Sequence, residues 1–177
     1  MNKTLLNIIF KSLLVSTFMF SSTIIQASDG KNDWVDSVFN SLSLNEKIGQ
    51  LFMVAAYSNK DLSHEKEISR LIEEFHIGGI IFYQGSPYKQ AHLTNKFQSV
   101  SKIPLLISID AEWGLSMRLD STIAFPKQMT LGAIQSNNLI YQMGQEIGKQ
   151  CKRLGVNMNM APVVDINNNP NNPVINS

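Results

Sequence analysis

A repeated alternation of short apolar runs and longer amphipathic stretches is the feature that most constrains this fold. Four apolar runs predict strands, at residues 53–57, 80–83, 105–109 and 156–165. Between successive runs, apolar residues recur at the spacing that places them on one face of a helix. Strands separated by helices pair in parallel through right-handed crossovers. The chain of 177 residues is therefore expected to adopt an α/β fold with about four βα units.

Two architectures remain open at this point. A small open α/β domain needs no more than four units. A (β/α)₈ TIM-type barrel needs eight strands and about 250 residues, so that this chain would form its first half.

Local signals predict where several helices begin. Residues 28–42 place apolar side chains such as Trp34 on one helical face. Ser43 and Glu46 have the spacing of a capping box, which starts a second, short helix. Pro87 suits the first turn of the helix that leads to the third strand.

A long amphipathic helix is expected over residues 138–154. Gly144 and Gly148 within it have the spacing of a close helix-packing contact. Cys151 belongs to the apolar series of this helix, so it is expected to be a core thiol. A lone cysteine cannot form a disulfide within the chain.

Charged residues follow the third predicted strand directly. Asp110 and Glu112 come after the apolar run 105–109, and Arg118 lies six residues beyond Glu112. A buried strand cannot hold unpaired charge, so Asp110 is expected to emerge at the carboxyl end of the strand, where α/β folds place ligand sites. The other interpretation is that these acids only cap the next helix.

The neighbouring residues favour a polyhydroxylated ligand. Trp113 offers a flat apolar face with one hydrogen-bond donor, and Gly114 permits a sharp turn. The carboxylate of Asp110 can accept from two hydroxyl groups, while the guanidinium of Arg118 donates in a fork. The fourth predicted strand alternates apolar residues with Asn157 and Asn159, which suits a strand that faces a polar barrel interior or a pocket.

The amino terminus has the pattern of a secretory signal peptide. Lys3 and Lys11 accompany a mostly apolar stretch over residues 13–25, and Ala27 precedes a polar region. We expect residues 1–27 to be removed, leaving residues 28–177 as an exported chain in the periplasm or outside the cell. The stretch is short and rich in serine for a transmembrane span, and a retained membrane anchor is the other interpretation.

Charge is nearly balanced, with 15 basic and 14 acidic residues. Nucleic-acid-binding proteins and electrostatic membrane binders usually carry a basic excess. We therefore expect no nucleic acid partner and no stable membrane association after signal cleavage.

Five segments, in one order and spacing, resemble glycoside hydrolase family 3, and within it the branch of bacterial β-N-acetylhexosaminidases. They are Leu44–Leu51, His76–Phe82, Ile107–Gly114 with Arg118-Leu119, Phe125-Pro126, and Leu154–Asn167 with Asn172-Pro173. Any one segment is a weak signal, but the ordered set covers most of the chain after Ser41.

The resemblance implies a (β/α)₈ barrel that binds a terminal sugar at the carboxyl ends of its strands and hydrolyses the glycosidic bond with retention. Asp110 matches the family's aspartate that holds hydroxyl groups of the sugar, and Arg118 matches the second arginine of its Gly-Gly-Arg-x-x-Arg stretch. Trp113 and Leu115 stand where the common version has glycine and arginine, which leaves the preferred sugar open. Asp165 matches a strand-end acid with a supporting role.

The resemblance implies no cofactor, no metal and no catalytic residue within the chain. Retaining hydrolysis needs a nucleophile and an acid/base about 5 to 5.5 Å apart, and Asp110 and Glu112 are not expected to be that pair. The family's nucleophile, its acid/base and its Lys-His-x-x-Gly-His loop are expected beyond Ser177. We interpret His64, His76 and His92 as surface or packing residues.

The leading hypothesis is the amino-terminal part of an exported β-N-acetylhexosaminidase that acts on terminal β-linked N-acetylglucosamine. The 177-residue chain alone is then expected to be inactive and poorly stable. Two other functions stay open: a β-glucosidase of the same family, and a non-catalytic carbohydrate-binding module.

Overall fold

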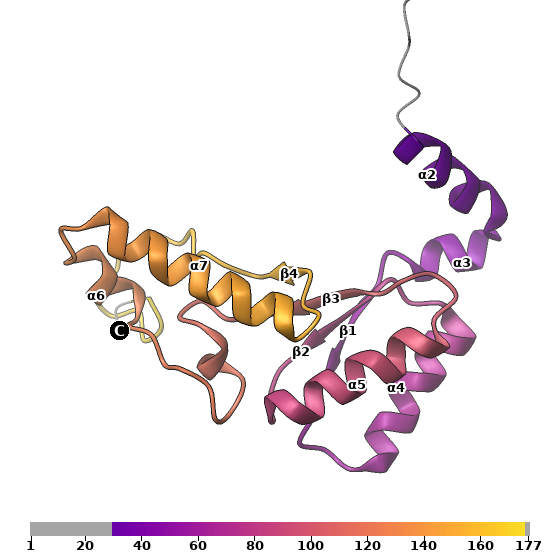
Figure 1. Ribbon diagram of the computed structural model, residues 1–177, viewed down its shortest axis with the longest axis horizontal. Helices are drawn as coiled ribbons and strands as arrows, with labels where there is room; N and C mark the ends of the chain where they lie inside the picture. The colour runs from indigo at the N-terminus through magenta and orange to yellow at the C-terminus, as the bar shows by residue number, and fades with distance from the viewer. Residues whose placement is uncertain (1–29, 176–177) are drawn as a thin grey trace, which may run out of the picture. The chain divides into compact units, whose positions relative to one another are not determined.

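The computed structural model describes residues 30–175 (Figure 1). The expected signal peptide, residues 1–27, lies outside the described residues. The chain divides into two compact units, one ending at Ser41 and the other beginning at Leu42. In the first unit, helix α2 (Gly30–Ser41) confirms the predicted first helix, and its Trp34 side chain is 58% exposed.

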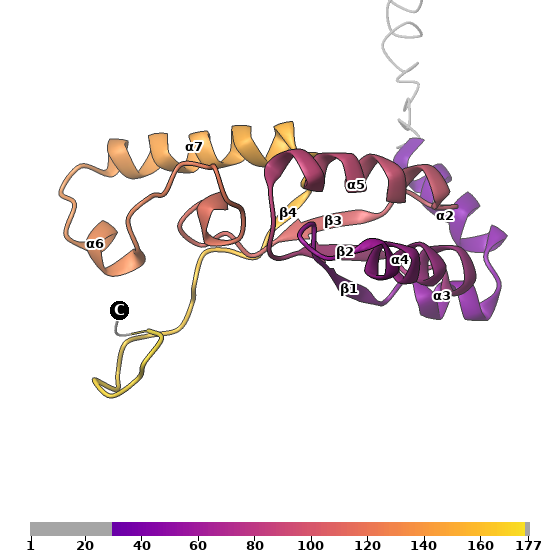
Figure 2. The same cartoon turned by 90° about the horizontal axis from the view of Figure 1, so that it is seen from below.

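The second unit is built on a four-stranded parallel sheet. Its strands are β1 (Met53–Ala56), β2 (Gly79–Phe82), β3 (Leu106–Ile109) and β4 (Met158–Asn159), paired in the order β1-β2-β3-β4. Helices α4 (Leu62–Phe75), α5 (Pro87–Val100) and α7 (Asn137–Arg153) each connect one strand to the next. Figure 2 shows α5 and α7 on the same side of β3. The arrangement confirms the predicted α/β fold, and four parallel strands in sequential order are what the first half of a (β/α)₈ barrel would contain.

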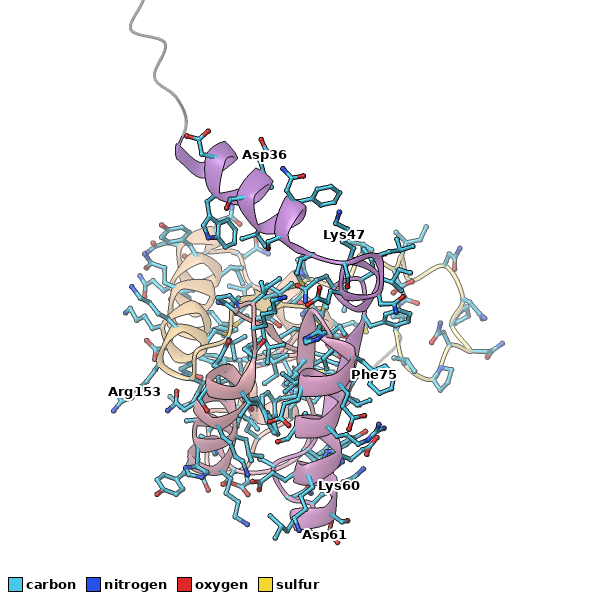
Figure 3. All side chains as sticks on the ribbon, turned by 90° about the vertical axis from the view of Figure 1, so that its right-hand side faces the viewer. Asp36, Lys47, Lys60, Asp61, Phe75 and Arg153 are labelled. Atoms are coloured by element: carbon cyan, nitrogen blue, oxygen red, sulfur yellow. The ribbon has the colours of Figure 1, made fainter. Side chains whose placement is uncertain are left out.

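The described part of the second unit also contains three shorter elements, one before β1 and two between β3 and α7. They are the helices α3 (Leu44–Gly49) and α6 (Gln128–Gly132) and the 3₁₀ turn η1 (Leu115–Met117). Figure 3 shows Asp61 and Phe75 at opposite ends of α4. Asp61 caps that helix by accepting a hydrogen bond from the backbone N–H of His64, and Pro87 occupies the first turn of α5 as predicted.

The predicted capping box at the start of α3 is confirmed. The backbone N–H of Ser43 donates to Glu46 Oε2 at 2.8 Å, and the backbone N–H of Glu46 donates to Ser43 Oγ at 3.3 Å. The ammonium group of Lys102 also donates to the Glu46 carboxylate. Lys102 lies beyond α5, so the acid of the capping box also ties α3 to a distant segment.

These contacts predict a defined acid sensitivity. The hydrogen bond from Lys102, followed by those from Ser43, lowers the pKa of Glu46 from 4.5 to about 2. Because the folded pKa is the lower one, the stabilisation is complete above about pH 4.5 and is lost as the pH falls towards 2. We expect the urea midpoint of the chain to fall more steeply over this range than that of its Glu46→Gln variant. Parallel pH profiles for the two proteins would contradict this assignment.

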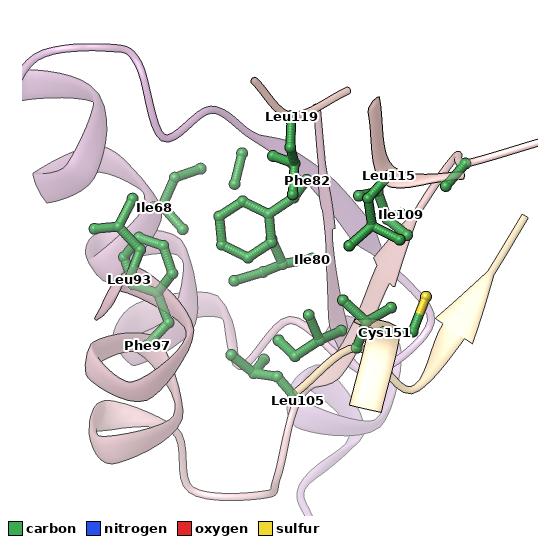
Figure 4. Close-up of a cluster of buried hydrophobic side chains, with 14 of the residues drawn as sticks. Ile68, Ile80, Phe82, Leu93, Phe97, Leu105, Ile109, Leu115, Leu119 and Cys151 are labelled. Carbon is green, nitrogen blue, oxygen red and sulfur yellow. The ribbon is translucent and has the colours of Figure 1, made fainter. Parts of the chain in front are cut away.

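The hydrophobic core lies between the sheet and its helices (Figure 4). Ile80 and Phe82 of β2 and Ile107 and Ile109 of β3 are at most 1% exposed. The helices contribute Ile68, Ile72, Leu93, Phe97, Ile147 and Cys151. Cys151 is thus the predicted core thiol, and burial raises its pKa.

The opposite face of the sheet is only partly covered. The apolar run 105–109 predicts a strand buried on both faces, and Ser108 on this second face is fully buried. Leu106, however, is 38% exposed, and Ala55 of β1 is exposed as well. The prediction is therefore wrong for part of β3, because the described connecting helices pack on the other face. In a closed barrel the second face lines the interior.

Strand β4 is shorter than its sequence predicts, since only Met158 and Asn159 pair with β3. The Oδ1 atom of Asn157 accepts from the backbone N–H of Ile107 at 2.9 Å, and Oδ1 of Asn159 accepts from that of Ala111 at 3.0 Å. Both side chains also border a cavity beside α7. The asparagine alternation thus serves strand pairing first, because side-chain oxygens replace backbone carbonyls as acceptors.

Helix α7 is confirmed, but among residues 30–175 its glycines make no close packing contact. A Cβ atom placed at Gly144 or Gly148 meets no atom within 4 Å. The two glycines border the cavity beside α7 together with Ile140 and Met143. The spacing of four residues puts them on one stripe, but within residues 30–175 no second helix packs against that stripe.

Candidate functional site

Three neighbouring strands end at one edge of the sheet. The last residues of β1, β2 and β3 are register partners. The residues that follow them, Tyr57, Tyr83 and Asp110, therefore lie at the same level of this edge. Parallel α/β folds place their ligand sites at the carboxyl ends of the strands. Asp110 emerges there, as its position in the sequence predicts.

Asp110 and Arg118 form an ion pair. Nη2 of Arg118 donates to the carboxylate Oδ2 of Asp110, and Nε donates to the Asp110 carbonyl oxygen at 3.0 Å. The Asp110 side chain is 23% exposed and that of Arg118 is 19% exposed. Charge-assisted hydrogen bonds are stronger than those between neutral groups. The pair is a well-held carboxylate and guanidinium that both still reach solvent.

The loop between the two residues is anchored by apolar side chains. Leu115 and Leu119 are 1% and 2% exposed. Gly114 has a φ of +92°, and a Cβ atom at this position would lie 2.6 Å from the ring of Phe125. Only glycine combines this backbone angle with so close an approach. The anchored loop returns the arginine to the strand end, so the short spacing between acid and arginine reflects one local turn.

Glu112 lies near the ion pair. Burial raises the pKa of its carboxyl group, and the negative charge of Asp110 raises it further. Arg118 opposes this shift, and Asp165 adds to it. Glu112 therefore stays protonated to a higher pH than an exposed glutamate, which lets its carboxyl group donate a hydrogen bond as well as accept one.

Three predicted site residues border one cavity. Glu112, Trp113 and Asp165 line a space of about 750 Å³, together with Lys127. Nζ of Lys127 lies 5.5 Å from the centre of the Trp113 ring, within the range of a cation–π contact. Asp110 and Arg118 are not among the lining residues. The five predicted residues thus form two groups, the ion pair and the cavity wall, and Glu112 is the acid whose charge interacts with both.

Sequence reasoning missed two tyrosines at this edge. The rings of Tyr57 and Tyr83 stack with their centres 5.7 Å apart and their planes at 23°. The guanidinium carbon of Arg118 lies 4.8 Å from the centre of the Tyr83 ring. One signal was available in the sequence. Each tyrosine stands at the end of an apolar run, and Asp110 directly follows the apolar run 105–109.

The histidines are surface or packing residues, as predicted. Nε2 of His64 accepts a hydrogen bond from the backbone N–H of Tyr57 at 3.1 Å. Burial, and after it the charge of Lys60, lowers the pKa of His64. His76 ends α4 in the left-handed conformation with a φ of +51°, and His92 is exposed. In the part of the chain that the structure describes, no three histidine, cysteine or acidic side chains gather as metal ligands do.

Comparison with known proteins adds independent information. The chain is 39% identical over 123 residues to beta-hexosaminidase A of Pseudoalteromonas piscicida, and this match covers 62% of this chain and 21% of the relative. It is 30% identical over 144 residues to a beta-N-acetylglucosaminidase/beta-glucosidase of Cellulomonas fimi, covering 81% of this chain and 25% of the relative. The chain thus spans about a fifth to a quarter of the length of these two proteins.

Solved structures resemble the described fold as well. A fungal multi-domain GH3 beta-N-acetylglucosaminidase is similar with a TM-score of 0.64 and 36% identity, over 75% of this chain and 16% of the other. The beta-glucoside phosphorylase BglX is similar with a TM-score of 0.69 and 24% identity, over 84% of this chain and 26% of the other, which is a likeness of fold alone.

The family itself follows from a match along most of the chain. Residues 43–177 match the model described as the glycosyl hydrolase family 3 N terminal domain. The match begins at the capping box of α3 and includes all four strands and the Asp110–Arg118 loop. This chain therefore belongs to glycoside hydrolase family 3, and residues 43–177 correspond to the N-terminal domain of that family.

Proposed function

We propose that this chain supplies part of the sugar-binding site of a retaining β-N-acetylhexosaminidase that removes terminal β-linked N-acetylglucosamine. The observation that carries the proposal is the Asp110–Arg118 ion pair at the carboxyl end of β3. A carboxylate accepts hydrogen bonds from neighbouring hydroxyl groups, and the adjacent guanidinium donates to the same ring. The relatives named beta-hexosaminidase support the choice of an amino sugar.

The remaining site residues take supporting roles in this proposal. Trp113 offers its ring to the apolar face of a sugar in the cavity that it borders with Lys127. Glu112 and Asp165 bind polar groups along the same wall. The proposal assigns the nucleophile and the acid/base to residues beyond Ser177 rather than to these acids or to Asp110, and it requires no metal or cofactor.

The decisive experiment is hydrolysis by the full-length gene product. We expect it to hydrolyse 4-nitrophenyl N-acetyl-β-D-glucosaminide with a kcat/KM at least about tenfold above that for 4-nitrophenyl β-D-glucoside, since a lost polar contact usually costs more than this. Proton NMR should detect the β-anomer of N-acetylglucosamine first, as retention requires. Release of the α-anomer first would overturn the retaining mechanism.

A second candidate function is β-glucosidase activity at the same site. It is favoured by the similarity to the beta-N-acetylglucosaminidase/beta-glucosidase of Cellulomonas fimi. Faster hydrolysis of the glucoside in the same assay would select it. Binding of N-acetylglucosamine without hydrolysis of either substrate would instead select the non-catalytic carbohydrate-binding module.

We also propose that the protein is exported, with residues 1–27 removed and residues 28–177 retained. The support is the basic and apolar pattern of the first residues. Among the helices of residues 30–175, none combines the length and apolarity that crossing a bilayer requires. Mass spectrometry of the protein from its native host should find Ser28 as the first residue, and an intact Met1 would contradict export by cleavage.

A further inference from the structure

We propose that Tyr83 is a positioning residue, which orients the Arg118 guanidinium and through it the Asp110 carboxylate for sugar binding. The inference rests on the proposed function of the Asp110 site, and it gives a role to a residue outside the five predicted site residues. Tyr83 follows β2 directly, whereas the acid and the arginine belong to the loop after β3. Two neighbouring strand ends thus cooperate in one binding unit.

The guanidinium group of Arg118 contacts both Asp110 and Tyr83. Its two hydrogen bonds to Asp110 hold the edge of the guanidinium group. The guanidinium carbon also lies over the ring of Tyr83, 4.8 Å from its centre. Hydrogen bonds along one edge leave the planar group free to tilt about that edge, and an aromatic ring next to the group restricts the tilt. Arg118 is therefore oriented by hydrogen bonds from one strand end and by an aromatic ring from the next.

Tyr83 also packs against Tyr57. The ring of Tyr57 stacks on it, with centres 5.7 Å apart and planes at 23°. Tyr57 is itself held by His64, whose Nε2 accepts its backbone N–H and whose ring meets it edge-on at 5.6 Å. Nζ of Lys60 lies 3.9 Å from the centre of the Tyr57 ring. Tyr83 thus packs against a second ring, which itself contacts His64 and Lys60.

The orientation of Arg118 affects how well a sugar hydroxyl group can bind. A hydroxyl group that accepts from Arg118 and donates to Asp110 requires both partners at a defined angle, and hydrogen bonds weaken steeply below about 120°. A guanidinium that tilts loses this alignment although its charge is unchanged. Loss of the Tyr83 ring should therefore weaken sugar binding without removing either charged group.

The experiment measures the Kd of N-acetylglucosamine by calorimetry on the full-length gene product. We expect Tyr83→Leu to raise the Kd about tenfold and Tyr83→Phe to change it less than about twofold, because phenylalanine retains the stacked ring. The matched control is Tyr88→Leu, at a side chain that is 83% exposed on α5, and it should leave the Kd unchanged. If Tyr83→Leu does not fold, Tyr57→Leu tests the same stack and should raise the Kd about threefold.

A second background separates positioning from direct contact with the ligand. In Arg118→Met, Tyr83→Leu should add less than about twofold, because the ring acts through the arginine. A full tenfold effect in that background, or equal losses in Tyr83→Leu and Tyr83→Phe, would overturn the positioning role. If the wild-type protein binds the sugar but Tyr83→Leu binds equally well, the inference fails and the proposed function stands. If the wild-type protein binds no sugar, both fail.

Discussion

Replacing Asp110 by alanine in the full-length gene product is expected to lower kcat/KM for 4-nitrophenyl N-acetyl-β-D-glucosaminide by about 10²- to 10³-fold. Each hydrogen bond to a charged group contributes about 1.5–3 kcal/mol, so two bonds to sugar hydroxyls amount to about 3–6 kcal/mol, and the expected loss of rate corresponds to the lower part of this range. The variant also leaves Arg118 without its carboxylate partner. Initial rates over a range of substrate concentrations provide the measurement.

The matched control is Asp120→Ala. Asp120 is an exposed acid in the same loop, and its backbone N–H, which the substitution retains, donates to the carbonyl oxygen of Gly85 at 2.9 Å. We expect this variant to stay within about twofold of the wild type, because exposed substitutions away from a site usually have small effects. A loss of less than tenfold in Asp110→Ala, or equal losses in the two variants, would show that Asp110 does not bind the substrate.

Replacing Gly85 by alanine is expected to destabilise the chain by about 3 kcal/mol, the largest stability effect that we predict. Gly85 has a φ of +138°, a sparsely populated backbone conformation that costs a residue with a side chain about 1–3 kcal/mol. A Cβ atom would also lie 2.0 Å from Oγ of Ser58 and 2.9 Å from the backbone nitrogen of Asn59, and such overpacking costs about 1–3 kcal/mol. The midpoint of urea unfolding, followed by circular dichroism, measures the loss.

Gly144→Ala is the control for the change from glycine to alanine itself. This glycine lies inside α7 with no atom within 4 Å of an added Cβ. Alanine in a helix interior is favoured over glycine by about 0.5–1 kcal/mol, so the variant should be more stable than the wild type. A similar midpoint for Gly85→Ala and the wild type would mean that the loop after β2 relaxes around the new side chain.

The elements themselves were readable from local sequence. The apolar series of residues 62–75 predicts a helix, which the fold contains as α4. The capping box of Ser43 and Glu46 and the proline at the start of α5 each predict where a helix begins, and both helices begin there. Such signals work because they depend on residues within a few positions of one another along the chain. Strand β4 was overestimated because its pairing depends on how far β3 extends beside it.

Contacts between distant segments escaped the same reasoning. Gly144 and Gly148 have the spacing of a packing contact, but a spacing does not say which element lies opposite. Tyr57 and Tyr83 belong to different strand ends, and their stacking appears only once β1 and β2 are paired in register. The link between Tyr83 and Arg118 needs in addition the turn that Leu115 and Leu119 anchor.

By itself, the sequence determined the order of strands and helices, the parallel sheet, the family and the strand-end position of Asp110, because periodicity, capping and motif spacing are properties of neighbouring residues. The tertiary structure alone decided that Asp110 pairs with Arg118, that Glu112, Trp113 and Asp165 share one cavity, and that the guanidinium group of Arg118 lies over the Tyr83 ring. These are distances between segments that folding brings together, and they depend on strand register and loop anchoring.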